Sequence, residues 1–276
     1  DVMAAAEAIL RVANARMAGA LRLVSIERGH DPARFTFMPF GGGGALHAGA
    51  LIREVGLARA LVPRFPGVTS ALGCVIADFR HDRVQTLNVM LDALDRAALR
   101  TAMDAAQGVL MPLLDLAGVA FTGRMVEHAL DMNYAGQTHT VAVRLALAPD
   151  GSGLLSREDV LAAFEAAYGA RFGRRMPGVA VRVLNLRSAV VGTRPRIDLA
   201  AMAPGPEASL GAAARGTRPV WFGDWCNSAV FDRLALPVGA VVPGPAVLEQ
   251  PDATILVEPG LAGRVDRFGN LILERA

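Results

Sequence analysis

The chain contains no lysine, since all 28 of its basic residues are arginine. A Schiff-base lysine, the lysine of a phosphate-binding P-loop and the lysine of a protein kinase are therefore excluded within this chain. Cysteine is also scarce, with only Cys74 and Cys226. Two cysteines can build neither a disulfide framework nor a four-cysteine zinc site. We expect both to be reduced thiols in a cytoplasmic protein.

Long apolar runs and a strong net charge are lacking as well. No run of about 18 uncharged apolar residues occurs, so no transmembrane helix is expected. The first residues have neither the basic start nor the apolar core of a signal peptide. A formal net charge of +2 argues against nucleic acid or an anionic membrane as a partner. The sequence starts at Asp1 without an initiator methionine, and we expect it to be a piece of a longer protein.

The composition is that of a folded protein with a substantial core. The 276 residues are 53% hydrophobic and 20% charged, which excludes disorder as the main state. This length suits one large domain or two small ones.

Helical and strand patterns alternate in the first part of the chain. An alanine-rich stretch with apolar residues at three- and four-residue steps predicts a helix that stops at Gly29. A short strand, a glycine run, a second helix and a second strand follow, which is an α/β pattern. The predicted elements are a helix at 2–28, a strand at 35–40, a helix at 45–55 and a strand at 59–62.

The rest of the chain shifts from helices toward strands. Two alternating segments flank Gly136 and predict a hairpin or bulge, and Ser156 is predicted to cap a helix. This order predicts an α+β unit, then a linker at 195–217 and a small β subdomain with many prolines and glycines. The predicted elements are helices at 70–78, 92–117 (interrupted at Pro112) and 156–172, and strands at 79–89, 124–134, 138–147 and 179–192.

Four consecutive glycines, Gly41–Gly44, follow the first predicted strand and open a helix. Glycine lets the backbone approach a ligand closely, and a helix start offers free N–H groups to an anion. The run matches neither a Walker A sequence nor the dinucleotide fingerprint. A ligand-binding loop and a plain tight turn are therefore both open from this segment alone.

Several ordered motifs together resemble the hydantoinase A/5-oxoprolinase family, which includes the ATP-using subunits of acetone and acetophenone carboxylases. They cover essentially the whole chain, and their order makes the resemblance far more specific than the glycine run alone. The motifs are Gly29-His30-Asp31-Pro32, the segment 40–48, Pro66-Gly67-Val68-Thr69-Ser70-Ala71-Leu72-Gly73, the segment 77–82, Asn133-Tyr134-Ala135-Gly136-Gln137, the segment 243–250 and the segment 265–271.

The resemblance implies the C-terminal part of a two-lobed ATPase related to actin and Hsp70. It implies an α/β ATPase-lobe segment at 1–90, an α+β C-terminal domain at 91–200, and a linker with a small β subdomain at 201–276. The family's N-terminal phosphate-binding segment is absent, so Gly41, Gly42, Gly43 and Gly44 are expected to contact the nucleotide from the adenosine side. An exposed apolar patch is expected on residues 1–60, because the other lobe is missing.

The activity implied by the resemblance is ATP-dependent hydrolysis of a cyclic amide, in which phosphorylation of the carbonyl oxygen drives ring opening. ATP and Mg2+ or another divalent metal are the implied cofactors. The implied partners are the missing N-terminal ATPase lobe, a hydantoinase B-type subunit in an oligomer, and a small cyclic amide or ketone substrate. A carboxylase subunit and a non-catalytic assembly module are the alternative functions.

Other polar residues have a functional and a structural interpretation. His47, Tyr134 and Gln137 are candidates for substrate or nucleotide contacts. For His47 the alternative, which is slightly favoured, is a hydrogen bond with a neighbouring loop. For Tyr134 and Gln137 the alternative is a β-bulge in which their side chains bond to the local backbone. The carboxylates and imidazole of Asp78, His81 and Asp82 are plausible metal ligands. Solvated charges paired with nearby arginines are the favoured alternative for these three.

Overall fold

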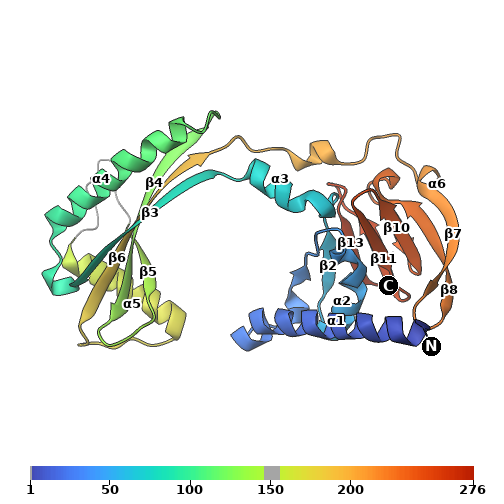
Figure 1. Ribbon diagram of the computed structural model, residues 1–276, viewed down its shortest axis with the longest axis horizontal. Helices are drawn as coiled ribbons and strands as arrows, with labels where there is room; N and C mark the ends of the chain where they lie inside the picture. Colours follow the sequence, from blue (N-terminus) through green and yellow to red (C-terminus); the bar gives the residue numbers. More distant parts are fainter. Residues whose placement is uncertain (1, 146–155) are drawn as a thin grey trace. The chain divides into compact units, whose positions relative to one another are not determined.

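The computed structural model describes residues 2–145 and 156–276. The chain forms two compact units, and each is described separately. Unit 1 combines Asp1–Val75 with Ile197–Ala276, and unit 2 is the continuous stretch Ile76–Arg196. The colours of Figure 1 show this division, because blue and red segments share unit 1 while green and yellow segments form unit 2.

Unit 1 is built on two sheets and a pair of N-terminal helices. One sheet has the order β1 (Thr36–Phe37), β2 (Arg59–Val62), β13 (Leu271–Arg275), β12 (Leu261–Val265) and β9 (Val241–Pro243). The other has the order β11 (Ala253–Val257), β10 (Ala246–Gln250), β8 (Trp225–Asp232) and β7 (Ala214–Trp221). The helices of this part of the chain are α1 (Val2–Val24), α2 (Ala48–Val55), the connecting α3 (Thr69–Ile76) and α6 (Leu210–Ala213).

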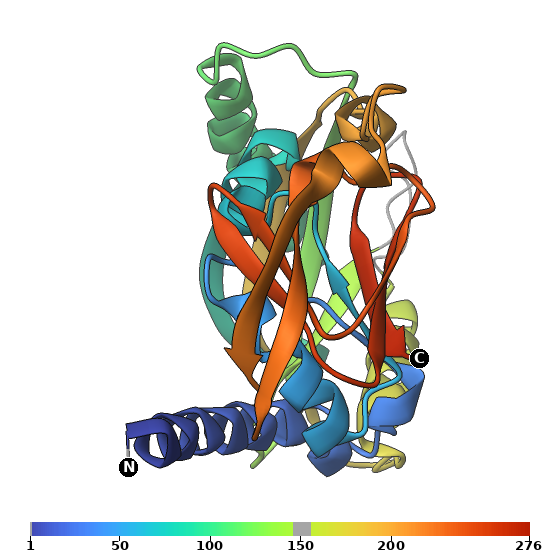
Figure 2. The ribbon, with the colours of Figure 1, turned by 90° about the vertical axis from the view of Figure 1, so that its right-hand side faces the viewer.

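The two sheets of unit 1 share one apolar core with α2. Alternate residues of the strands point inward, and Ile52 of α2 packs with Val62 of β2, Leu248 of β10 and Leu273 of β13. Helix α1 packs on α2 through Ala18 and Leu51, and it runs below the strands in Figure 2. The parallel pair β1–β2, joined through α2, therefore holds the glycine loop at one end of a packed layer.

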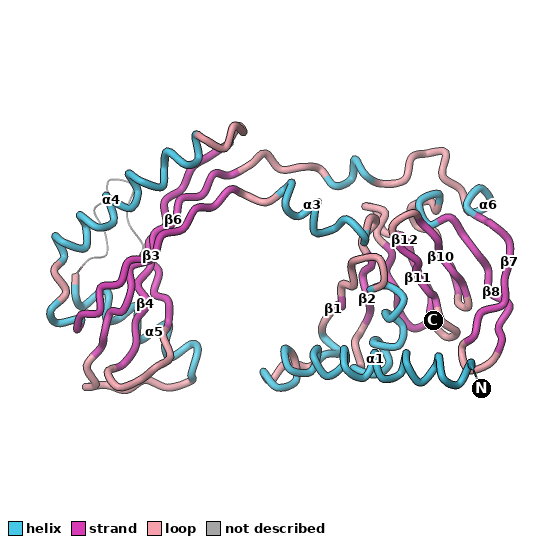
Figure 3. The backbone as a smooth tube through the Cα atoms, viewed as in Figure 1, coloured by secondary structure: helices cyan, strands magenta, loops and turns pink. Residues whose placement is uncertain are grey.

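Unit 2 is a four-stranded antiparallel sheet with two helices on one face. The sheet order is β3 (Phe79–Met90), β6 (Val181–Thr193), β4 (Gly123–Tyr134) and β5 (Val141–Leu145). Helices α4 (Arg96–Asp115) and α5 (Arg157–Phe172) pack on the same face, where Met103 of α4 and Phe164 of α5 share an apolar core with Leu130 of β4. Figure 3 shows these long strands in magenta and both helices in cyan.

Most predicted elements are present near their predicted positions. The hairpin at Gly136 has φ +87°, and the Ser156 hydroxyl accepts a hydrogen bond from the Asp159 N–H at 3.0 Å as the helix cap. Helix α4 continues through Pro112 to Asp115, although an interruption was predicted there. The Leu116 N–H still donates to the Pro112 carbonyl, so the last turn closes despite the proline.

The compact units divide the chain differently from the boundaries expected at residues 90 and 200. Strand β3 belongs to unit 2 because it pairs with β6. The C-terminal strands do not form a separate subdomain, because β13 pairs antiparallel with β2 and both contribute to one core. None of the described helices is long and apolar enough to cross a membrane.

Candidate functional site

The glycine loop connects β1 to α2 in unit 1. A short 3-10 turn, Gly44–His47, follows the glycines and leads directly into α2. The Gly41 N–H donates to the Pro66 carbonyl at 2.6 Å and fixes the start of the loop. Gly41 has φ +84°, a conformation that a side chain would strain. The predicted strand–glycine–helix arrangement is therefore confirmed, with a 3-10 turn as its first helical part.

The middle of the loop is open and carries free backbone donors. Gly42 and Gly43 are exposed, and no atom lies within 4 Å of the position that a Cβ on Gly43 would take. The N–H groups of Gly42, Gly43 and Gly44 form no hydrogen bond with any other described residue. Consecutive free N–H groups at a helix start can bind an anionic group. The loop thus offers a set of hydrogen-bond donors that suits an anionic group.

One side of the loop rests on the turn after β10. A Cβ on Gly42 would lie 3.2 Å from the Asp252 carbonyl oxygen, so glycine allows this close approach. The Asp252 carboxylate accepts from the Gly67 N–H at 2.8 Å. The turn at 250–252 therefore joins the loop to the segment after β2.

His47 lies at the start of α2, where its ring Nδ1 is 2.7 Å from the Asn14 Oδ1 of α1. The side chain is half-buried between the two helices. This contact is the structural interpretation of His47, with a helix rather than a loop as its partner.

Two arginines of unit 1, the buried Arg233 and the half-buried Arg64, were missed by sequence reasoning. Arg233 is fully buried, and burial lowers its pKa to about 10, with a further contribution from the nearby charge of Arg64. Arg233 donates to the Gly269 carbonyl at 2.6 Å, and Arg64 donates to the Leu234 carbonyl at 3.2 Å. No periodicity marks a buried arginine, because the sequence does not show which strands will enclose it.

Tyr134 and Gln137 lie in the core of unit 2 and at its edge. Tyr134 is 1% exposed, its ring packs on Phe164 and Tyr168, and its hydroxyl accepts from the Met176 N–H at 3.1 Å. Gln137 and the Tyr168 hydroxyl are hydrogen-bonded at 2.9 Å. The side chains of Tyr134 and Gln137 thus bond to residues far along the chain rather than to the local backbone, and they hold the hairpin against α5.

The metal site suggested for Asp78, His81 and Asp82 is not assembled. Within residues 2–145 and 156–276, no group of three His, Cys, Asp or Glu side chains could hold a metal ion. His81 and Asp82 are neighbours on β3, and successive side chains of a strand point to opposite faces. The Asp78 carboxylate instead accepts from the Arg194 N–H at 2.8 Å, and Asp82 pairs with Arg80. The alternative of paired charges is the one observed.

Comparison with known proteins matches almost the whole chain. A family model described as hydantoinase/oxoprolinase matches residues 1–83, and a model of the hydantoinase/oxoprolinase C-terminal domain matches residues 99–276. The caprolactamase subunit alpha of Pseudomonas jessenii is 30% identical over 94% of this chain and 38% of its own length.

Two solved structures share the fold. The crystal structure of the ATP-dependent caprolactamase from Pseudomonas jessenii has a TM-score of 0.69 and 27% identity, over all of this chain and 40% of that one. A nucleotide-free acetone carboxylase structure has a TM-score of 0.79 at 22% identity, again over 40% of its chain. The mixed α/β and α+β class is confirmed. The chain spans about two fifths of the length of these relatives.

Proposed function

The chain belongs to the hydantoinase/oxoprolinase family, and we propose that it is the C-terminal portion of an ATP-dependent enzyme that opens a cyclic amide. The observation that carries the proposal is the open glycine loop, in which the consecutive N–H groups of Gly42, Gly43 and Gly44 form no hydrogen bond with any other described residue. The similarity to a caprolactamase subunit over 94% of the chain supports the cyclic amide as the substrate class.

The chemistry explains why such an enzyme needs ATP. The oxygen of an amide is a poor leaving group, and ATP supplies the phosphoryl group that makes the carbonyl carbon open to attack by water. Catalysis of phosphoryl transfer depends on positioning and on positive groups around the phosphates. In this chain the N–H groups of Gly42, Gly43 and Gly44 are the donors that would hold the nucleotide. The described residues offer no set of ligands for the divalent metal, so we assign no metal-dependent step to them.

A carboxylase subunit is the alternative within the same family. The acetone carboxylase structure has the higher TM-score, but at 22% identity this likeness shows the fold alone. The caprolactamase is more similar in sequence, at 27% in the structural comparison. We therefore favour hydrolysis over carboxylation.

Nucleotide binding by the glycine loop is tested with a fluorescent ATP analogue and the variant Gly43→Arg. The new side chain meets no atom at its Cβ, so it covers the loop without displacing its neighbours. We expect at least tenfold weaker binding, because the arginine blocks access to the free N–H groups. Gly73→Arg on α3, where a Cβ also meets nothing within 4 Å, is the matched control and should leave binding unchanged.

The same titration is repeated with the N-terminal lobe added in trans, because the loop forms one wall of a two-lobed site. Equal affinity of the wild type and Gly43→Arg with both lobes present would contradict the proposal. A complex with both lobes that binds no nucleotide at all would contradict it too.

We also propose that the N-terminal lobe covers the first half of α1. Apolar side chains there are uncovered, with exposed fractions of 70% for Ile9, 54% for Leu10 and 57% for Val12. Contiguous apolar patches of this kind mark interaction surfaces. We expect the chain to bind a hydrophobic dye strongly. The double variant Ile9→Gln/Val12→Gln should bind less dye. The control Leu116→Gln, at an 81% exposed position of unit 2, should bind as much dye as the wild type. Equal dye binding by the two variants would count against this surface.

A B-type second subunit in an oligomer is the further partner we propose.

A further inference from the structure

The face of the unit 2 sheet that α4 and α5 leave uncovered contains a charged hollow. Helices α4 and α5 pack on the opposite face of the sheet.

The hollow has a volume of about 510 Å³ and is lined by Arg80, Asp82, Glu127, Ala129, Arg144 and Arg187, among others. The alanines of its floor leave room between the longer charged side chains.

The strand register places the charges in two rows across the sheet. In one row Ala129 of β4 lies between its partners Arg187 on β6 and Arg144 on β5. Neighbouring strands are about 4.8 Å apart, so the two arginine Cα atoms lie about 10 Å apart with a methyl group between them. Two guanidinium groups on either side of a small residue can hold one carboxylate between them.

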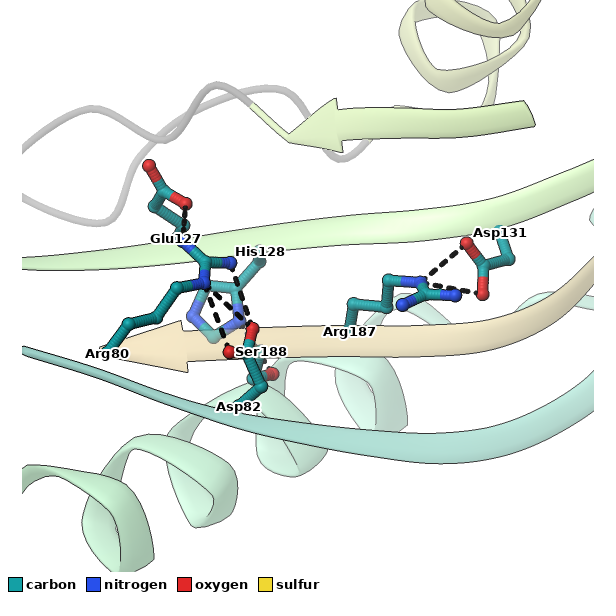
Figure 4. A network of polar contacts seen from close by, with 7 residues as sticks. All are labelled: Arg80, Asp82, Glu127, His128, Asp131, Arg187 and Ser188. Carbon is teal, nitrogen blue, oxygen red and sulfur yellow. Dashed lines mark hydrogen bonds and ion pairs between the residues drawn. The ribbon is translucent and has the colours of Figure 1, made fainter. Parts of the chain in front are cut away.

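Arg187 is held in place with its outer nitrogens free. Its Nε donates to both Asp131 carboxylate oxygens, at 2.7 and 2.8 Å, as Figure 4 shows. Asn185 donates to the same carboxylate at 3.0 Å and fixes its orientation. The hydrogen bond with Asp131 also raises the pKa of Arg187. The two Nη groups form no hydrogen bond with any other described residue, so they are available to a ligand.

Arg144 is exposed and has no ion pair or side-chain hydrogen bond with any residue of the described ranges. Its charge is therefore not paired with any acidic side chain of the described residues. Together with the free end of Arg187, it makes this end of the hollow electropositive.

The second row is acidic. Ala189 of β6 lies between its partners Asp82 on β3 and Glu127 on β4, and both carboxylates share the single cation Arg80. Glu127 and Ala129 are two residues apart on one strand, which separates the rows by about 7 Å. The hollow is thus positive at one end and negative at the other.

We propose that this hollow binds a small monocarboxylate, with its carboxylate between Arg144 and Arg187 and its other end, neutral or cationic, toward Asp82 and Glu127. A second carboxylate at the far end meets like charge and is disfavoured. An opened cyclic amide carries a carboxylate and an amine and belongs to this class. That link rests on the proposed function, whereas the site itself does not.

Calorimetric titration of the 276-residue chain with three six-carbon ligands tests the site. We expect saturable binding of hexanoate, at least equal affinity for 6-aminohexanoate, and about tenfold weaker binding of adipate. Loss of one charge-assisted hydrogen bond is expected to weaken hexanoate binding about tenfold in Arg144→Gln and in Arg187→Gln. Arg124→Gln, which removes an arginine paired with Asp115, is the control and should bind as the wild type does.

Arg144→Gln keeps the test decisive even if Arg187→Gln fails to fold, because Arg144 has no described partner to lose. Absence of saturable hexanoate binding, or unchanged affinity in Arg144→Gln, overturns the site. Tighter binding of adipate than of 6-aminohexanoate overturns the assigned polarity. None of these ligands is a nucleotide, so failure here is distinct from failure of the glycine loop to bind the ATP analogue.

Discussion

The two units of the chain are assembled from the sequence in different ways. Unit 2 is one continuous stretch, and its strands β4 and β5 are joined by the short turn at Gly136. Unit 1 is made of two stretches from opposite ends of the chain, and its β2 has β13 as a neighbour. Unit 2 can therefore complete its sheet without the rest of the chain, whereas the N-terminal stretch of unit 1 cannot.

Expressing segments of the chain separately should have the largest effect on folding stability. We expect residues 76–196 alone to unfold cooperatively, because their sheet and both helices are complete. Residues 1–75 alone should not, because β1 and β2 then lack β13 and most of the shared core. Circular dichroism during heating measures both. A cooperative transition in the isolated 1–75 segment would remove the distinction between the units.

This difference also explains what could be predicted from the sequence. The Ser156 cap, the Gly136 hairpin and the glycine loop depend on residues close together in the chain, and the structure contains all three. The pairing of β2 with β13 depends on residues far apart, and no local pattern indicates it.

The candidate sites follow the same rule. His81 and Asp82 are close in sequence, yet a strand sends neighbouring side chains to opposite faces, so the suggested metal site is not formed. Arg80 and Glu127 are far apart in sequence but pair at 2.7 Å across the sheet. A site whose residues are brought together by strand pairing cannot be predicted from the sequence until the register of the strands is known.

Gly244→Ala should give the next largest effect, and it acts on unit 1. A Cβ at this position would lie 2.1 Å from the Glu258 carbonyl oxygen, a backbone atom that cannot turn away. We expect the free energy of unfolding of unit 1 to fall by about 3 kcal/mol. Urea unfolding followed by tryptophan fluorescence measures it selectively, because both tryptophans, Trp221 and Trp225, lie in unit 1.

Gly108→Ala is the matched control in unit 2. Gly108 is an exposed position inside α4 with no atom within 4 Å of its Cβ position. Alanine should stabilise this helix by about 0.5–1 kcal/mol without changing the tryptophan signal. Similar losses from the two alanine substitutions would show that close backbone contact does not distinguish Gly244.

Acid should produce the smallest effect, and it should act on unit 2. His128 is 6% exposed under α4, and its Nδ1 is 2.9 Å from the Ser188 Oγ. Burial lowers the pKa of His128 below its ordinary value of 6.5, against the attraction of Asp104. The unfolded state therefore binds the proton more readily, and unit 2 loses stability as the pH falls below 6.5 toward the folded-state pKa. Each unit of pKa difference corresponds to about 1.4 kcal/mol.

Near-ultraviolet circular dichroism of Tyr134 and Tyr168, both in unit 2, follows this unfolding. His128→Asn should remove the acid-dependent loss, whereas His139→Asn, at an exposed position of the same unit, should keep it. An equal loss in His128→Asn and in the wild type would mean that another group of unit 2 carries the acid sensitivity.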